Sequence, residues 1–185
     1  MVRFYEKGTA RMKSILYLIG FMGSGKSTVS KYLETHMHMK RIEMDQEIEK
    51  REGRSIVDIF AEKGEDYFRQ KETELLEEIA GMDQIVVSCG GGIIKSAKNR
   101  EIMKRSGKVV LLDASPAVIL ERLKDKNDRP LLKGRMSEEG IRELMDERRP
   151  LYEAAADEII VTDGLSAASI AKLLVSAPRI RNPRL

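Results

Sequence analysis

The stretch Gly20–Ser27, GFMGSGKS, directly follows an apolar run, Ser14–Ile19. Its GxxxxGKS spacing is the Walker A pattern, which joins a strand to a helix. In such a loop the glycines let backbone N–H groups surround a phosphate, and the N-terminus of the next helix adds its positive dipole end. The stretch therefore predicts a binding site for a nucleoside triphosphate.

Each side chain of this loop has an expected task. Lys26 reaches the β- and γ-phosphates as a point charge, and the Ser27 hydroxyl is a ligand of Mg²⁺. We therefore expect ATP as a substrate and Mg²⁺ as its cofactor. The residues expected to bind ATP in this loop are Gly23, Ser24, Gly25, Lys26, Ser27 and Thr28.

Short apolar runs alternate with amphipathic stretches along the chain, and this rhythm predicts an α/β fold with a parallel sheet between two layers of helices. The expected strands are 14–19, 40–43, 84–88, 108–113 and 158–162. The expected helices are 25–35, 45–52 (with Asp45 as N-cap), 65–80, one opening at Ser115-Pro116, one from Ser137 towards Ala155, and 166–175. We expect a single domain over residues 14–177.

One segment, Asp125–Met136, breaks the rhythm, because it is charged, contains Pro and Gly, and lies between two helices. Beside a phosphate loop this composition predicts a lid over about 124–136. The alternative is an ordinary exposed connector.

The net charge of +3 comes from the ends of the chain. The extension 1–13 and the tail 178–185 hold seven of the 33 Lys and Arg residues but one of the 30 Asp and Glu residues, so the body is slightly acidic. A nucleic-acid-binding body would be basic, so we expect no nucleic-acid partner. No apolar stretch is long enough for a membrane span. The single cysteine, Cys89, excludes an internal disulfide and fits a reducing cytoplasm. We expect a monomer.

Carboxylates near the end of the second strand offer catalytic chemistry. Glu43 and Asp45 are two residues apart, and on a strand end they would point the same way. One would hold Mg²⁺ through water, and the other would accept a proton from an acceptor hydroxyl. Asp113 also ends an apolar run, like a Walker B aspartate, but Ser115-Pro116 opens a helix so soon afterwards that we expect a structural role for Asp113.

Arginines and glycines offer an acceptor pocket. Arg69 suits an acceptor carboxylate, although a surface ion pair with neighbouring glutamates explains it equally well. The triplet Gly90–Gly92 admits a ligand close to the main chain. Arg129 in the expected lid and Arg148 supply further cations.

Together these stretches resemble the shikimate kinase family from about Leu16 to Ala171. The resemblance rests on GFMGSGKS, on MDQEIE followed by GRSIVDIFAEKGEDYFRQKE, and on SCGGG, DRPLL and ERRPLY, in the family's order and spacing. It implies a P-loop NTPase fold of the nucleoside-monophosphate-kinase type, with a five-stranded parallel sheet and a lid. It also implies transfer of the ATP γ-phosphate to the 3-hydroxyl of shikimate, in aromatic amino-acid biosynthesis.

The resemblance also implies roles for individual residues, with a substrate-binding region at about 44–80. Asp45 matches the aspartate that contacts the shikimate hydroxyls and serves as the general base. Arg69 and Arg148 match the arginines that clamp the carboxylate, and Gly90, Gly91 and Gly92 match the ligand-binding glycine loop. Arg129 matches the lid arginine that approaches the phosphates, and Arg122 falls where the family places an adenine-contacting arginine.

Two positions depart from the family pattern. Glu43 stands where the family usually has an aspartate that helps to organise magnesium, so we expect altered magnesium dependence with activity retained. Cys89 stands where a small residue, often threonine, is common, and we expect a buried thiol near the site with no catalytic role.

Two rival interpretations stay open at this point. The first is a kinase for another small acceptor, such as gluconate, another sugar acid or a nucleoside monophosphate. The second is a non-catalytic module that binds nucleotide.

Overall fold

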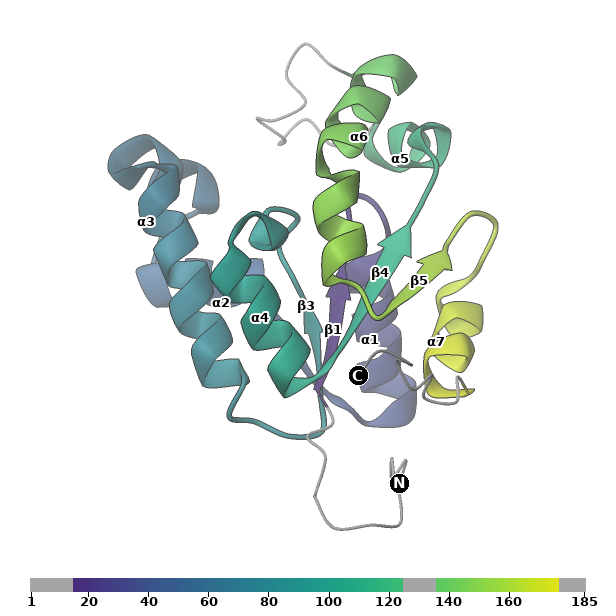
Figure 1. Ribbon diagram of the computed structural model, residues 1–185, viewed down its shortest axis with the longest axis horizontal. Coiled ribbons are helices and arrows are strands. Elements are labelled where there is room, and N and C mark those ends of the chain that lie inside the picture. Colours follow the sequence, from purple (N-terminus) through teal and green to yellow (C-terminus); the bar gives the residue numbers. More distant parts are fainter. Residues whose placement is uncertain (1–14, 125–135, 177–185) are drawn as a thin grey trace.

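The computed structural model describes residues 15–124 and 136–176. Five strands form one sheet in the order β2-β3-β1-β4-β5, and every neighbouring pair is parallel (Figure 1). The strands are β1 (Ile15–Ile19), β2 (Lys40–Glu43), β3 (Ile85–Ser88), β4 (Lys108–Asp113) and β5 (Glu158–Val161). The five-stranded parallel sheet expected from the resemblance is therefore confirmed.

Helices cover both faces of this sheet. They are α1 (Lys26–Met37), α2 (Met44–Glu52), α3 (Ile56–Ile79), α4 (Ala97–Ser106), α5 (Pro116–Leu123), α6 (Glu138–Ala155) and α7 (Ala167–Ser176), with a 3₁₀ turn η1 at Ile93–Lys95. In Figure 1, α1 and α7 lie on one face, and α2, α3, α4 and α6 lie on the other. The expected three-layer sandwich is confirmed.

The central strand β1 shows why the sheet needs both helical layers. Successive side chains of a strand point to opposite faces. Tyr17 and Ile19 join one buried cluster, with residues of α3 and α4, and Leu18 joins the other, with residues of α1 and α7. A strand that is buried on both faces carries an unbroken apolar run, as this one does.

Strand order determines where the functional loops meet. Because β1 lies between β3 and β4, the phosphate loop after β1 lies beside the loops that follow those two strands. Ligands of open α/β sheets bind at this carboxyl edge. The glycine triplet follows β3, and Asp113 ends β4.

The structure differs from the expected helices at α2, α3 and α4. Helix α2 begins at Met44, with Glu43 as N-cap, so the prediction of Asp45 as N-cap is wrong. Helix α3 begins at Ile56, after the N-cap Ser55, and bends at Gly64, where φ is 82°. Helix α4 was not predicted, although Ser96 caps its N-terminus.

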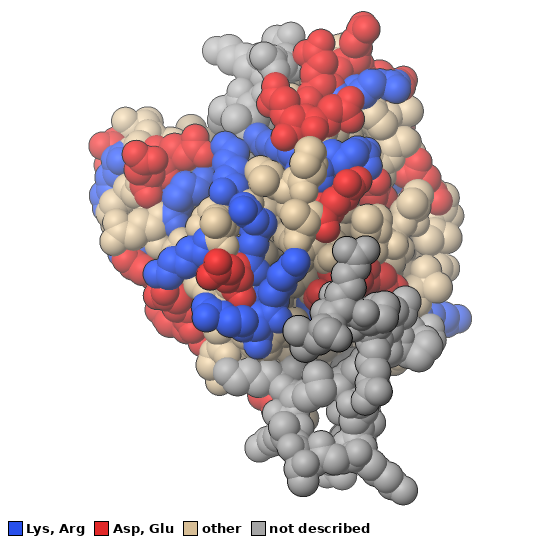
Figure 2. All heavy atoms as spheres, in the orientation of Figure 1, with Lys and Arg blue, Asp and Glu red and all other residues tan. Residues whose placement is uncertain are grey.

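The expected extension 1–13, tail 178–185 and nearly all of the expected lid, including Arg129, lie outside the described residues. No helix among residues 15–124 and 136–176 is long and apolar enough to cross a membrane. On the face drawn in Figure 2, basic and acidic side chains are mixed.

Candidate active site

The phosphate loop depends on glycine at defined positions. Gly20 has a φ of 144°, and a Cβ there would lie 2.4 Å from the carbonyl oxygen of Leu112. Gly25 is the N-cap of α1 with a φ of 102°. Both backbone conformations favour glycine over any residue with a side chain. The loop therefore packs against β4, and the N-terminus of α1 points into the loop.

The expected ATP-binding residues line one cavity of about 410 Å³. Its walls include all six residues of Gly23–Thr28, together with Arg122. The Arg122 guanidinium reaches back from α5 and donates to the carbonyl oxygen of Gly23, at 3.0 Å. The Lys26 ammonium lies within the loop, 2.9 Å from the carbonyl oxygens of Gly20 and Phe21.

A second group of residues gathers around the first glycine of the triplet. An ideal Cβ at Gly90 would lie 2.6 Å from Asp45 Oδ1 and 2.8 Å from Glu72 Oε1. Two carboxylates therefore converge on one backbone position. Asp45 comes from the first turn of α2 and Glu72 from the middle of α3.

Glu72 is fully buried, and its Oε1 has no hydrogen-bond partner among the described residues. Burial raises the pKa of this carboxyl to about 7, against the opposing effect of the Arg69 charge, and the nearby Asp45 raises it further. Sequence reasoning missed Glu72. The available signal was its position on the apolar face of α3, where a glutamate is unexpected.

Arg69 lies flat against the last glycine of the triplet. A Cβ at Gly92 would lie 2.5 Å from Arg69 Nη2 and 2.6 Å from Nη1. The guanidinium donates to Glu65 Oε1 from Nε at 3.0 Å and from Nη2 at 2.9 Å, and Nη1 donates to Glu72. The predicted carboxylate-binding arginine and the predicted glycine loop are thus in contact.

Arg148 approaches the phosphate loop from α6. Its guanidinium carbon lies 5.8 Å from the centre of the Phe21 ring, and its side chain is largely buried. Tyr152, one turn further along α6, donates to the carbonyl oxygen of Gly91 at 2.6 Å. Burial raises the pKa of Tyr152 to about 12, while the charges of Arg148 and then Arg69 act to lower it. The charges of both arginines therefore act on the Tyr152 hydroxyl. Sequence reasoning missed Tyr152.

Glu43 and Asp45 do not share a strand, because β2 ends at Glu43 and α2 begins at the next residue. The prediction that the two side chains point the same way assumed that both residues lie on one strand, and it is therefore wrong. The Glu43 carboxylate accepts hydrogen bonds from Arg41 Nη2 at 2.9 Å and from the Ser88 hydroxyl at 2.7 Å. These bonds hold it against the end of β3.

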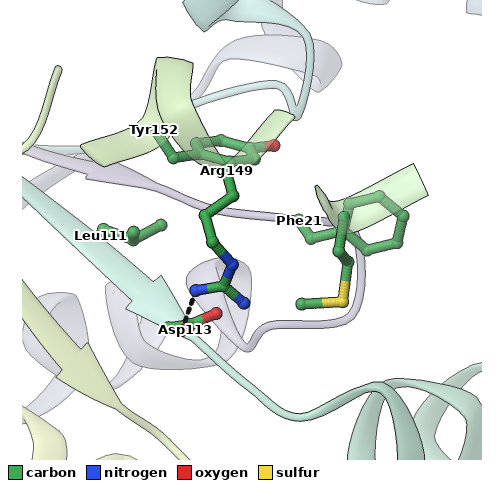
Figure 3. Close-up of a pocket in the computed structure, with 6 residues that line it drawn as sticks. Phe21, Leu111, Asp113, Arg149 and Tyr152 are labelled. Atoms are coloured by element: carbon green, nitrogen blue, oxygen red, sulfur yellow. Dashed lines mark hydrogen bonds and ion pairs between the residues drawn. The ribbon is translucent and has the colours of Figure 1, made fainter. Parts of the chain in front are cut away.

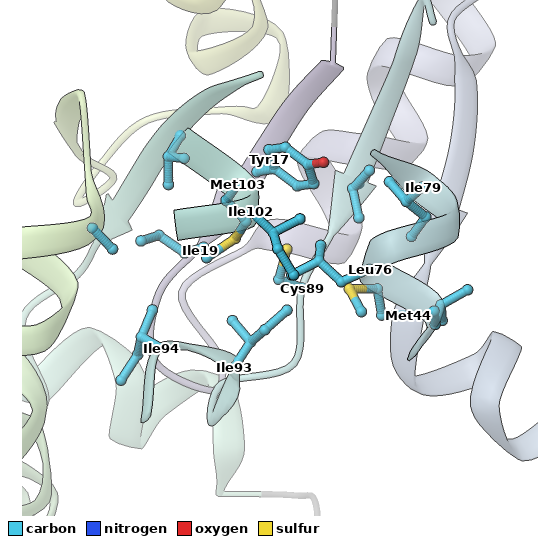
Figure 4. Packing of buried hydrophobic residues seen from close by; sticks show 14 of the residues in the cluster. Tyr17, Ile19, Met44, Leu76, Ile79, Cys89, Ile93, Ile94, Ile102 and Met103 are labelled. Carbon is cyan, nitrogen blue, oxygen red and sulfur yellow. The ribbon is translucent and has the colours of Figure 1, made fainter. Parts of the chain in front are cut away.

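Cys89 is buried in the large core cluster, beside Met44 and Leu76 (Figure 4). Burial raises the pKa of its thiol well above the usual range. The charges that act on it are those of Lys26, Glu72, Glu43 and Asp45, so it lies between the phosphate loop and the carboxylates. The prediction of a buried thiol near the site is confirmed.

Asp113 faces α6 (Figure 3). Its Oδ2 accepts a hydrogen bond from Arg149 Nη1 at 3.3 Å, in a small cavity lined also by Phe21, Leu111, Met145 and Tyr152. Its carbonyl oxygen accepts the backbone N–H of Thr162 at 2.7 Å. Both contacts join the end of β4 to neighbouring elements, and the structural role expected for this residue stays a prediction.

The phosphate loop and the glycine triplet touch each other. A Cβ at Gly91 would lie 3.7 Å from the carbonyl oxygen of Gly20 and 3.8 Å from the amide nitrogen of Met22. The glycine triplet is thus packed against the phosphate loop. A parallel sheet with a phosphate loop after its central strand, and with a group of charged side chains beside that loop, is the arrangement expected of small P-loop kinases.

Comparisons with known proteins identify the family. The family model described as shikimate kinase matches residues 22–178. A shikimate kinase of Persephonella marina is 46% identical over 155 residues, which cover 84% of this chain and 93% of that protein. One of a Sulfurihydrogenibium species is 48% identical over 144 residues, 78% of this chain and 85% of that protein.

A solved structure agrees with these sequence matches. The shikimate kinase of Acinetobacter baumannii, in complex with shikimate, superposes with a TM-score of 0.82 at 36% identity, over 88% of this chain and 91% of that one. The chain belongs to the shikimate kinase family. It is therefore an enzyme, an ATP-dependent phosphotransferase, with the P-loop fold of that family.

Proposed function

We propose that this chain transfers the γ-phosphoryl group of ATP to the 3-hydroxyl of shikimate, giving shikimate 3-phosphate and ADP in the pathway to chorismate and the aromatic amino acids. One observation carries the proposal beyond family membership. The glycine triplet touches the phosphate loop on one side and Arg69 and Asp45 on the other. A small acceptor held there would have its hydroxyl close to a phosphate held in the loop.

Arg69 and Arg148 would bind the carboxylate of the acceptor. A guanidinium suits this task because its planar fork matches two carboxylate oxygens. Both side chains are mostly withdrawn from water, which strengthens their interaction with an anion. Arg148→Lys should therefore weaken shikimate binding more than it lowers turnover, because a point charge cannot replace the fork.

Asp45 would orient the acceptor hydroxyl and accept its proton. Its carboxylate lies against Gly90, on the side of the glycine triplet where the acceptor would bind. Lys26 would offset charge on the transferring phosphoryl group, and Arg129, which lies outside the described residues, would join it from the lid. Arg122, whose guanidinium lines the nucleotide cavity, would contact the adenine.

The donor set also fits Mg²⁺, which prefers hard oxygen ligands and retains several waters. The Ser27 hydroxyl is exposed at the start of α1, where it would be a direct ligand. Glu43 would act through water, because each carboxylate oxygen can accept a further hydrogen bond besides those from Arg41 and Ser88. The bound metal would neutralise charge on the phosphates.

Further features of the protein belong to the same proposal. We infer a monomeric, cytoplasmic enzyme with ATP and shikimate as its partners and no nucleic acid or membrane partner. Residues 44–80 would form the substrate-binding region and 124–136 the lid, within one domain over 14–177. The lid would exclude water as a competing phosphoryl acceptor.

An ADP-release assay with ATP and Mg²⁺ tests the function directly. Shikimate, gluconate and AMP are added separately, and release is expected with shikimate alone. Release with another acceptor would keep the kinase and reject the pocket assignment. No release with any of the three, together with ATP binding, would support a non-catalytic module instead.

A further inference from the structure

The guanidinium of Arg69 is already occupied by carboxylates of its own helix. Nε and Nη2 form one of the two guanidinium edges that can bind a carboxylate with two parallel hydrogen bonds, and Nη1 and Nη2 form the other. Both Nε and Nη2 donate to a single oxygen, Oε1 of Glu65. The third nitrogen, Nη1, donates to Glu72. An acceptor carboxylate that binds Arg69 at the Nε–Nη2 edge must therefore displace Glu65.

The two glutamates differ in their freedom to move. Glu72 is fully buried, so it cannot leave Arg69 without leaving the core. The Glu65 side chain is 50% exposed, so it can turn into water. Glu65 also follows Gly64 directly, where α3 bends and its second half begins. The exchangeable partner of Arg69 is therefore Glu65.

A second cation, the ammonium of Lys95, lies beside the Glu65 carboxylate. Lys95 Nζ lies 3.2 Å from the same oxygen, Glu65 Oε1, that Arg69 holds. Lys95 ends η1, which directly follows the glycine triplet. Arg69 and then Lys95 lower the pKa of the Glu65 carboxyl, so the side chain is an anion shared by two cations. Glu65 can therefore release Arg69 and keep its ion pair with Lys95.

We propose that Glu65 is an internal competitor for the acceptor carboxylate: it occupies the Nε–Nη2 edge of Arg69, where the acceptor binds, and moves onto Lys95 when the acceptor arrives. Glu65 and Lys95 then set the affinity for the acceptor without touching it. This inference rests on the proposed function, in which Arg69 binds the carboxylate of shikimate.

The expected effect is modest, because an ion pair with a half-exposed partner is weak. Removing the Glu65 charge frees the edge of Arg69, so the Kd for shikimate should fall roughly two- to fivefold in Glu65→Gln. Removing the alternative cation should have the opposite effect. Lys95→Met should raise the Kd, and it should have no such effect once Glu65 is glutamine.

Titration calorimetry of shikimate, in the absence of ATP, measures this affinity directly. The wild-type protein is compared with Glu65→Gln, Lys95→Met, the double variant and Glu74→Gln. Glu74 is the matched control, because it is an exposed glutamate of the same helix that pairs with Lys71 at 2.7 Å. Its variant should leave the Kd unchanged. The methyl ester of shikimate should bind Glu65→Gln no better than wild type.

An unchanged or raised Kd in Glu65→Gln would overturn the inference, because Glu65 would then only orient Arg69 or stabilise the helix. If the wild-type protein phosphorylates shikimate while the Kd of Glu65→Gln is unchanged or raised, the proposed function stands and only this inference fails. A wild-type protein that neither binds nor phosphorylates shikimate rejects both. A gain in Glu65→Gln that persists with the methyl ester would also overturn the inference.

Discussion

Arg149 on α6 holds the carboxylate of Asp113 at the end of β4, with 3.3 Å between Nη1 and Oδ2. The preceding residue, Arg148, is buried near Phe21 of the phosphate loop. Two adjacent arginines of one helix thus make different contacts, Arg149 with the sheet and Arg148 with the phosphate loop. Arg149 ties the helix to the sheet, and this tie helps to fix where Arg148 enters the site.

The first prediction concerns the Walker-B-like position. Asp113→Asn should keep turnover and magnesium dependence within a few-fold of wild type, because its carboxylate serves the contact with Arg149. The ion pair is partly exposed, so its loss should cost about 1 kcal/mol of unfolding free energy or less. Magnesium titrations of the initial rate and urea unfolding measure the two effects.

Arg149→Gln is the matched variant, since it removes the same ion pair from the other side. A collapse of magnesium dependence in Asp113→Asn, with Arg149→Gln unaffected, would make Asp113 a metal carboxylate and reject the structural role.

The second prediction separates two neighbouring glycines. Gly92→Ala would put a methyl group 2.5 Å from Arg69 Nη2, so the guanidinium must move. Hydrogen bonds to charged groups contribute about 1.5–3 kcal/mol, so displacing the clamp should raise the KM for shikimate by about tenfold or more. The initial rate at varied shikimate concentration measures it.

Gly91→Ala provides the comparison, because its Cβ would meet its nearest neighbours only at ordinary contact, from 3.7 Å. It should raise the KM for shikimate less than Gly92→Ala does. If both variants raised the KM for shikimate equally, the triplet would act through its backbone alone. The effect of Gly92→Ala would then not come from displacing Arg69.

The third prediction follows from the buried carboxyl of Glu72. Its pKa is raised from 4.5 to about 7 in the folded protein, chiefly by burial. Between these two values the unfolded chain releases a proton that the folded protein retains, so the contribution of Glu72 to stability falls as pH rises. Each pKa unit corresponds to about 1.4 kcal/mol, so the loss over the whole shift should be on the order of 3 kcal/mol.

Glu72→Gln should remove this loss, so its stability relative to wild type should increase between pH 4.5 and 7. Urea unfolding at pH 5 and at pH 7.5 measures the change. Glu74→Gln, in which an exposed glutamate of the same helix is replaced, should show no such increase. Parallel pH curves for wild type and Glu72→Gln would show that Glu72 is charged in the folded protein.

Much of the fold followed from local pattern. The strand 108–113 and the start of α6 after Ser137 are as predicted, because each has a sharp local signal: a β-branched apolar run in one and a capping serine in the other. The first half of α3 and all of α4 were missed. The missed part of α3 is apolar enough for a helix but ends at the non-helical Gly64. Helix α4 has few apolar residues, so its packing against neighbouring elements decides it more than periodicity does.

The site was predictable where a motif carries backbone geometry, as at Gly25 and Lys26. It was not predictable where the chemistry depends on distant segments. Glu72 matters because α3 brings it against Gly90, and Tyr152 because α6 brings it to Gly91. The only local signal of either contact is a glutamate on the apolar face of α3.

The last prediction tests the proposed general base. Asp45→Asn keeps the size of the side chain but removes the negative charge that would accept the hydroxyl proton. Turnover should fall about 10²–10⁴-fold, the usual cost of losing a general base. The Kd values for ATP and shikimate should change much less, because Lys26, Arg69 and Arg148 remain. Single-turnover ADP release and calorimetry measure the two quantities separately.

Glu47→Gln is the matched control, since Glu47 lies on the same helix two residues further along and pairs with Arg51 at 2.9 Å. Its turnover should stay near that of wild type. If Asp45→Asn retained turnover within a few-fold of wild type, the hydroxyl proton would not pass to Asp45. The buried Glu72 beside it, which meets the same face of Gly90, would then be the carboxylate to replace next.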